Sequence, residues 1–345
     1  MNKFFGLIAA AAMLVAFSAS SFADSSPVNI AWSHYTGWEF LGYMQDSGIM
    51  DKWNKKMGTN VKFTFVGSYE DSVALFAGKQ YNGVSVTAQD ALAIAGVAGR
   101  HSVALIVGDY SNGNDGVALK GYKTLKDIKT PVALVQYSVS HYLLARCAEQ
   151  AGMSIDQFQL EKALDSDIPS LVQNQDNVAV VSWNPFLKTI ANTRGVNVVC
   201  DSSKIPGEII DMVVVGDEVD QKSREAIVGA WYETIGLVEA GNKEVIAALA
   251  KQAGGSVEDF TSQLKTTHMF WTPADAVKFT KDAKLRETME KVIKFSFNNG
   301  VFDGPKSVDE MGVKFPDGGV LYNPKNVMLT FDPFTMQEAA DGKIK

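Results

Sequence analysis

The sequence has few of the residues that carry catalysis or bind transition metals. It contains four histidines, at positions 34, 101, 141 and 268, and none has a partner at the spacing of a metal site. The motifs HExxH and GxSxG, the P-loop, and a GxGxxG turn after a strand are all missing. The sequence therefore predicts a protein that is not an enzyme and holds no cofactor or metal ion.

Cysteine is scarce as well, with two residues in the chain. Cys147 falls on the apolar face of an expected helix, and Cys200 ends the strand-like stretch VNVVC. A disulfide between them and a pair of inert buried thiols both fit this placement.

Basic residues are fewer than acidic ones, and no block of like charge occurs. Lys and Arg total 32 against 39 Asp and Glu, for a net charge of −7. Nucleic acid and anionic membranes are therefore not expected as partners. A neutral or cationic small molecule is easier to accommodate.

The one long apolar run lies at the N-terminus. MNKFFGLIAAAAMLVAFSASSFA has a single lysine, an apolar stretch from 4 to 17, and small residues at Ser21 and Ala23. Because this stretch is too short for a good membrane span, it predicts a secretory signal peptide over 1–23, cleaved after Ala23. The mature chain would carry 31 basic and 39 acidic residues, a net charge of 31 minus 39, or −8.

The rest of the chain predicts an α/β fold. Apolar strands at 28–32, 61–66, 83–86 and 102–107 alternate with helical segments that include 38–57 and 69–77. Strands separated by helices imply βαβ units and mostly parallel sheets.

The length and the 46% hydrophobic content suggest two lobes. We expect lobe 1 to be discontinuous, over 24–118 and 213–345, and lobe 2 to span 119–212. Two hinge crossings would join them, and the helical segments after 221 would coat lobe 1.

Two carboxylates follow predicted strands. Asp90 comes after GVSVT and Asp109 after SVALIVG, so both are expected at strand ends on the same side of the first sheet. Small ligands bind at that edge of open α/β sheets, and carboxylates suit a planar cation of the amidinium or guanidinium kind. An N-cap role for Asp90 and a turn role for Asp109 fit equally well.

Aromatic residues gather where the first strand meets the first helix. His34 and Trp38 are expected to contact a ligand there, whereas Trp32 suits the core and Tyr35 the surface. Trp183 ends the strand VAVVSW and either closes over the ligand from lobe 2 or packs in the core.

Other polar residues favour structural roles. The pairs Asn112-Gly113 and Asp115-Gly116 are strong turn signals. Asp211 has apolar neighbours, which favours a buried structural carboxylate over a contact with a cation.

Two stretches carry a resemblance to a known family. SVSHYLLARCAEQAGM has a serine-rich helix entry with histidine, and VAVVSWNPFLKTI joins an apolar strand to an aromatic residue and a proline. With the leader and the lobe order, they resemble the type II periplasmic binding proteins of ABC importers, in the nitrate, sulfonate and taurine class. ALIVGDYSNGNDGVALKG and FPDGGVLYNPKNVMLTFD are most similar to the subgroup associated with urea carboxylase.

The resemblance implies a periplasmic, monomeric protein that traps a solute between two lobes and docks transiently on a membrane permease. A small nitrogen-rich solute, like urea or guanidine, would be held by His34, Trp38, Asp90 and Asp109 of lobe 1. Ser138, Ser140 and Trp183 would close from lobe 2.

One residue departs from the sulfonate-binding pattern. Tyr137 stands where glycine commonly precedes the serine of the helix entry, and it would narrow an anion site or stack on a planar cation. Taurine, an alkyl sulfonate, nitrate or a thiamine precursor remains an alternative solute, and a periplasmic sensor module is an alternative role. A pyrimidine-synthase-like enzyme shares the fold, but the leader argues against it.

Overall fold

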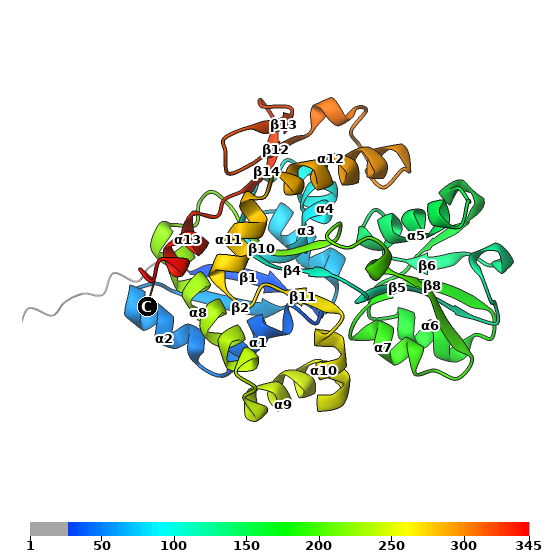
Figure 1. Ribbon diagram of the computed structural model, residues 1–345, viewed down its shortest axis with the longest axis horizontal. Helices are drawn as coiled ribbons and strands as arrows, with labels where there is room; N and C mark the ends of the chain where they lie inside the picture. Colours follow the sequence, from blue (N-terminus) through cyan, green and yellow to red (C-terminus); the bar gives the residue numbers. More distant parts are fainter. Residues whose placement is uncertain (1–26, 345) are drawn as a thin grey trace, which may run out of the picture.

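The computed structural model describes residues 27–344, so the expected leader and its cleavage site lie outside the described residues. Within that range the chain forms two lobes, each built on its own sheet and covered by helices (Figure 1). The α/β fold expected from the sequence is confirmed. None of the helices between residues 27 and 344 has the length and apolar character needed to cross a membrane.

Lobe 1, formed by residues 27–111 and 210–344, contains a nine-stranded sheet. Its strand order is β13-β12-β14-β4-β10-β3-β1-β2, with β11 paired to β4. The strands are β1 (Val28–Trp32), β2 (Val61–Phe65), β3 (Gly83–Thr87), β4 (Ser102–Ser111), β10 (Ile210–Val215), β11 (Thr267–Met269), β12 (Gly312–Lys314), β13 (Val320–Tyr322) and β14 (Val327–Phe331). β1 pairs in parallel with β2 and β3, whereas β10 runs antiparallel between β3 and β4.

The helices of lobe 1 mostly follow the periodicity of the sequence. The expected helix over 38–57 is divided at Gly48, whose φ of 78° ends the first segment. The helices are α1 (Glu39–Asp46), α2 (Ile49–Met57), α3 (Tyr69–Ala77), α4 (Ala88–Asp90) continued by a π-helix (Ala91–Gly96), α8 (Gln221–Glu239), α9 (Lys243–Gln252), α10 (Val257–Leu264), α11 (Pro273–Lys281), α12 (Ala283–Asn298) and α13 (Phe334–Ala340).

Lobe 2, formed by residues 115–201, contains a five-stranded sheet of order β7-β6-β8-β5-β9. β5 runs antiparallel to β8 and β9, and β6 runs parallel to β7 and β8. The elements are β5 (Asp115–Lys120), β6 (Val132–Leu134), α5 (Val139–Gln150), β7 (Leu160–Lys162), α6 (Ile168–Asn174), β8 (Val178–Trp183), α7 (Phe186–Ala191) and β9 (Val196–Asp201). Short 3-10 helices lie at Leu125–Asp127, Ile155–Gln157, Ser202–Lys204 and Val308–Glu310.

The chain passes between the lobes twice. The outward passage lies between Ser111 and Asp115, and the return lies between Asp201 and Ile210. In both passages the chain moves from one sheet to the other a few residues before the lobe boundaries, at 118 and 212, that the sequence predicts. As a result β5 belongs to the second sheet, and Asp115 is its first residue rather than part of a turn.

The helix α12 contacts both lobes, which differs from the expectation that the C-terminal helices coat lobe 1 alone. Its residues Met289 and Ile293 pack in the core of lobe 1. Val292 packs with the core of lobe 2, and Phe295 lies against that core. The helix therefore buries two apolar stripes, one toward each lobe.

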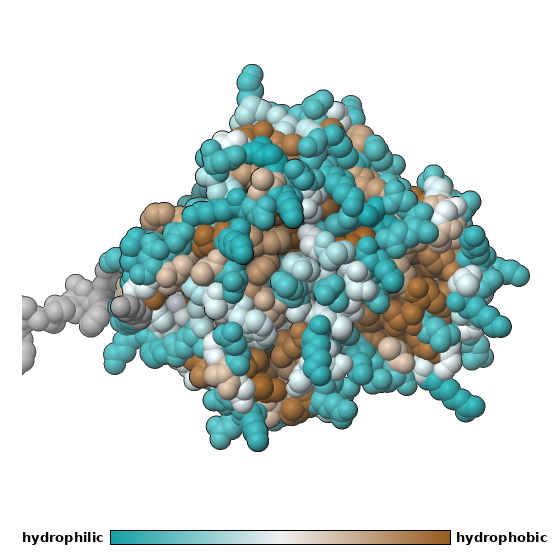
Figure 2. All heavy atoms as spheres, viewed as in Figure 1, coloured by the Kyte–Doolittle hydropathy of each residue, from teal (hydrophilic) through white to brown (hydrophobic). Residues whose placement is uncertain are grey.

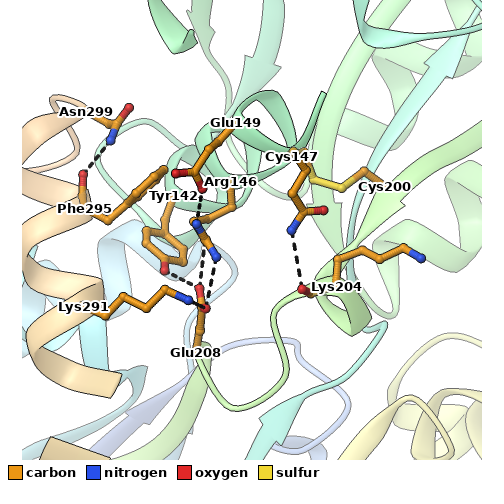
Figure 3. Close-up of polar contacts among 11 residues, drawn as sticks. Tyr142, Arg146, Cys147, Glu149, Cys200, Lys204, Glu208, Lys291, Phe295 and Asn299 are labelled. Carbon is orange, nitrogen blue, oxygen red and sulfur yellow. Dashed lines mark hydrogen bonds and ion pairs between the residues drawn. A yellow bond between two sulfur atoms is a disulfide. The ribbon is translucent and has the colours of Figure 1, made fainter. Parts of the chain in front are cut away.

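A polar cluster joins α12 to the return passage and to α5 (Figure 3). Glu208, in the passage, accepts hydrogen bonds from Tyr142, from Arg146 at 3.0 Å and from Lys291 of α12. At the next residue of α5 after Arg146, a disulfide joins Cys147 to Cys200 with a Cα–Cα distance of 6.1 Å. The pairing that the sequence left open is thus present, and it fastens α5 to β9.

Side chains of opposite lobes meet across the cleft. Lys162 of lobe 2 forms an ion pair with Glu70 of lobe 1 at 2.6 Å, and Lys188 of lobe 2 lies 3.5 Å from Asp259 of lobe 1. In the face of Figure 2 the two lobes touch without a wide opening, and hydrophilic side chains cover most of that face. The lobes are therefore closed on one another.

Candidate functional site

A small cavity lies between the two lobes. Its volume is about 10 Å³ for the centre of a water-sized sphere, which is the room of about one water molecule. Side chains or backbone of both lobes line it: Tyr35, Trp38, Tyr69, Thr87 and Asp211 from lobe 1, with Asp115, Val139 and Trp183 from lobe 2. A site shared by two lobes forms only when they close.

Four aromatic rings form most of the wall. Trp38, at the start of α1, stacks on Tyr69 with 5.5 Å between ring centroids, and it lies 5.0 Å from Tyr35. Trp183 of lobe 2 meets Tyr69 edge to face at 5.4 Å. All four rings are buried. Such rings shed water from a ligand and attract a cation to their faces.

Two carboxylates line the cavity, and two more lie directly behind it. Asp115 begins β5 and Asp211 lies in β10, and both belong to the wall. Behind the wall, Asp109 accepts a hydrogen bond from the Tyr35 hydroxyl at 2.9 Å. Asp90 accepts one from the Tyr69 hydroxyl at 2.7 Å. The two inner carboxylates thus fix the two tyrosines.

The local sequence explains how Asp90 is held. Thr87 ends β3 and caps the following helix, because its hydroxyl accepts the Asp90 N–H at 3.1 Å. The hydroxyl of Tyr69 also accepts the Thr87 N–H at 3.3 Å. The Asp90 carboxylate is therefore directed from the strand end toward lobe 2.

The four carboxylates are buried without a cationic partner. Each leaves one oxygen with no hydrogen-bond partner within the protein. None of the ion pairs among residues 27–344 involves any of them. Burial raises the pKa of Asp90, Asp109 and Asp115 to about 7, and it raises the pKa of Asp211 well above its usual range. A cation in the cavity would stabilise their ionised forms.

Backbone and carboxylate groups also connect the two lobes around the cavity. The Val139 N–H at the start of α5 donates to Asp90 at 3.2 Å. In the opposite direction, the Tyr69 N–H at the start of α3 donates to Asp165 of lobe 2 at 3.3 Å. Each helix N-terminus, which favours negative charge, thus receives a carboxylate from the other lobe.

The negative charge around the cavity limits the kind of ligand that it can hold. The N-terminus of α5 would suit an anion, but Asp90 of the protein already takes that position. An added anion would meet carboxylates and no cationic side chain. The acceptor groups around the cavity are complementary to N–H donors and to positive charge.

The predicted ligand residues divide into three groups. Trp38 and Trp183 line the cavity, and Asp90 and Asp109 support its wall. The side chain of His34 is 24% exposed and pairs with Glu39 at 2.7 Å, so it points away from the cavity. Only its carbonyl oxygen takes part, by accepting the Trp183 indole N–H at 2.8 Å.

The two predicted serines do not line the cavity. Ser138 is the N-cap of α5, because its hydroxyl accepts the Ser140 N–H at 3.1 Å. Ser140 is fully buried beside it, and the cavity wall is Val139 between them. Tyr137 is 43% exposed and absent from the wall, so it neither narrows the site nor stacks within it.

Several wall residues were missed or assigned to other roles from the sequence. Tyr35, expected at the surface, is 3% exposed. Asp115 was assigned to a turn and Asp211 to a structural role. Tyr69 opens an amphipathic helix and carried no distinguishing signal. The sequence does show acidic and aromatic residues near the ends of strands. Which of these residues lie together depends on how the strands pair, and the sequence does not show that pairing.

The acidic residues do not form a recognisable metal site. Among residues 27–344, no group of three or more His, Cys, Asp or Glu side chains has the arrangement needed to hold a metal ion. A molecular cation with several N–H donors satisfies carboxylates spread around a wall better than a single ion does.

No protein-family model matches the sequence, and no curated protein matches it. Solved structures do share its fold. The alkanesulfonate-binding protein SsuA from Xanthomonas axonopodis pv. citri, bound to MOPS, has a TM-score of 0.67 at 12% identity, covering 82% of this chain and 96% of that one.

Two further neighbours extend this likeness. The periplasmic nitrate-binding protein NrtA from Synechocystis PCC 6803 has a TM-score of 0.56 at 13% identity, covering 92% of this chain and 98% of that one. A Candida albicans gene product described as having the generic periplasmic binding protein fold has a TM-score of 0.59 at 14% identity, over 79% and 95%. At these identities the likeness establishes the fold and no more.

Proposed function

We propose that the chain is the solute-binding component of an ABC importer and captures a small nitrogen-rich cation of the guanidine kind. The observation that carries this proposal is the cavity between the lobes, where four aromatic rings surround two carboxylates, Asp115 and Asp211, that no basic side chain neutralises. A planar guanidinium offers N–H donors to such carboxylates and a flat face to the rings.

The size of the site supports a solute of a few heavy atoms. The closed cavity offers about 10 Å³ to the centre of a water-sized sphere. Guanidinium, with four heavy atoms, is larger than this space and would need the lobes to part slightly, whereas an alkyl sulfonate or a thiamine precursor would have to hold them further apart. Urea has the same planar shape as guanidinium, and it is the neutral alternative.

The charge of the site separates this proposal from the anions named for two of the structural neighbours. Sulfonate or nitrate would lie against buried carboxylates, at a cost that rises in a low-dielectric cavity. The neighbours therefore support the two-lobe capture mechanism but not their own solutes.

The fold and the expected leader support a role in transport. We place the protein in the periplasm as a monomer that closes on its solute, docks transiently on a membrane permease, and releases the solute by opening. No chemical change of the solute is involved. A sensor module that signals from the closed form is the second role compatible with this mechanism.

A thermal-shift panel tests the proposal. Guanidinium at about 100 times its dissociation constant should stabilise the protein by about 2.7 kcal/mol, or roughly 5 °C for a chain of this size. The panel also includes urea, acetamide, taurine, an alkyl sulfonate and nitrate, each against sodium chloride at equal ionic strength. Stabilisation by the sulfonate or nitrate alone would overturn the assignment of a cation.

A matched pair of variants connects the panel to the cavity. Asp115→Asn removes a carboxylate of the wall and should abolish most of the shift with guanidinium. Asp127→Asn removes an exposed carboxylate of lobe 2 that lies outside the cavity wall, and it should leave the shift as in the wild type. Equal shifts in both variants would mean that guanidinium binds elsewhere.

A further inference from the structure

Two of the buried carboxylates stand directly opposite each other on adjacent strands. In the antiparallel pair of β4 and β10, Asp211 is in register with Asp109. Opposite residues in such a pair project to the same face of the sheet, with about 4.5 to 5.5 Å between their Cβ atoms. Asp109 is fully buried and Asp211 is 1% exposed, so both carboxyl groups lie away from water.

The side chains that contact this pair, or lie opposite it on neighbouring strands, are neutral or acidic, including Met269 of β11 opposite Asp109. Tyr35, from the loop after β1, donates to Asp109 at 2.9 Å. On β3 the register partner of Asp211 is Thr87, and Asp115 of β5 adds a further carboxylate nearby. No lysine, arginine or histidine of residues 27–344 forms an ion pair with either member.

The backbone of Gly37 closes over the same pair. A Cβ atom at this glycine would lie 2.2 Å from the second oxygen of Asp109, so no other residue fits without displacing the carboxyl group. That oxygen has no hydrogen-bond partner within the described residues, and one oxygen of Asp211 has none either. The chain therefore leaves Asp109 and Asp211 to satisfy each other.

Two ionised carboxylates cannot remain side by side in such surroundings, and a shared proton removes the repulsion. Burial is the main cause that raises the pKa of both groups. The negative charge of Asp109 raises the pKa of Asp211 further.

We propose that Asp109 and Asp211 share one proton and act as a single negative charge in the wall of the solute site. The pair then offers the solute a donor as well as acceptors. The inference rests on the proposed function for the identity of the solute, but the shared proton belongs to the protein.

Binding of guanidinium to three variants tests the shared charge. Asp109→Asn and Asp211→Asn each leave one ionised carboxylate in the pair, whereas the double variant leaves none. Each loss is measured as the fold-decrease in affinity relative to the wild type. We expect the loss of the double variant to exceed the product of the two single losses by at least about tenfold, because only the double variant removes the last charged hydrogen-bond acceptor of the pair. A double loss equal to that product, with each single loss above tenfold, would mean two independent charges and would overturn the proposal.

Infrared spectroscopy tests the proton without any solute. At pH 8.5 the wild-type protein should retain the C=O stretching band of a protonated carboxyl group, and both single variants should lack it. Absence of this band from the wild type overturns the proposal even if the variants fold poorly. If guanidinium does not bind the wild type, the proposed function fails, and the infrared band still decides whether the proton is shared.

Discussion

Trp183 offers a direct test of how the two lobes hold a cation. The residue belongs to lobe 2, yet it is 3% exposed and packs within the hydrophobic core of lobe 1. Its ring lines the cavity, and its indole N–H donates to the His34 carbonyl oxygen across the cleft at 2.8 Å. One side chain therefore both lines the cavity and joins the two lobes.

Two substitutions separate these contributions. Trp183→Phe keeps an aromatic face but removes the hydrogen bond, at a cost of about 1 kcal/mol, or roughly fivefold in affinity. Trp183→Leu also removes the aromatic face from a desolvated cation, at about 2 kcal/mol more. The expected loss for Trp183→Leu is therefore about 3 kcal/mol, or roughly 150-fold.

Isothermal titration with guanidinium measures both losses. Trp271→Leu is the matched control, because Trp271 packs partly buried against the core of lobe 1 but is not part of the cavity wall. Circular dichroism and the thermal midpoint establish that each variant is folded. An affinity of Trp183→Leu within about twofold of the wild type would refute the aromatic wall as a source of binding energy.

Three further predictions concern charge, pH and stability. Asp90→Asn replaces the charged acceptor of the Val139 N–H and should weaken guanidinium binding by about 1.5 kcal/mol at pH 8.5, measured by titration; unchanged affinity would mean that this contact does not favour closure. The carboxylates with pKa values of about 7 bind more protons in the folded than in the unfolded state, so the unfolding free energy without solute should rise as the pH is lowered from 8 to 5. Guanidinium affinity should fall as the pH is lowered from 8 to 6, because the carboxylates become protonated. Urea titrations measure the first trend and calorimetry the second, and opposite slopes would contradict this prediction. Replacing Cys147 and Cys200 together by serine opens a loop of 53 residues and should cost about 4 kcal/mol of unfolding free energy, and an equal urea midpoint would rule this out.

Much of the fold could be predicted from local patterns in the sequence. The strand over 28–32 and the helix over 69–77 are found at those residues, because apolar periodicity and capping residues act within a few positions. The helix α12, by contrast, was expected to pack on lobe 1 only, and it contacts both lobes. Which lobe a helix covers depends on partners far away in the sequence.

The candidate site was only partly predictable, for a similar reason. Asp90 and Asp109 were singled out because they follow strands, and the structure places both one layer behind the cavity wall. Asp115 and Asp211 form the wall instead. The wall residues differ from the expected ones because β5 starts earlier than expected and β10 lies between β3 and β4. The order of residues along the chain does not show this order of strands in the sheet.

The sequence by itself determined the class of architecture and the chemical character of the site. Alternating apolar strands and helices require a layered α/β protein, and an excess of acidic over basic residues disfavours anionic partners. Only the tertiary structure decided which carboxylates meet. Register across β10 sets Asp211 opposite Asp109, and closure brings Trp183 to Tyr69. Burial of these carboxylates together raises their pKa values, an effect that arises only when separate segments meet.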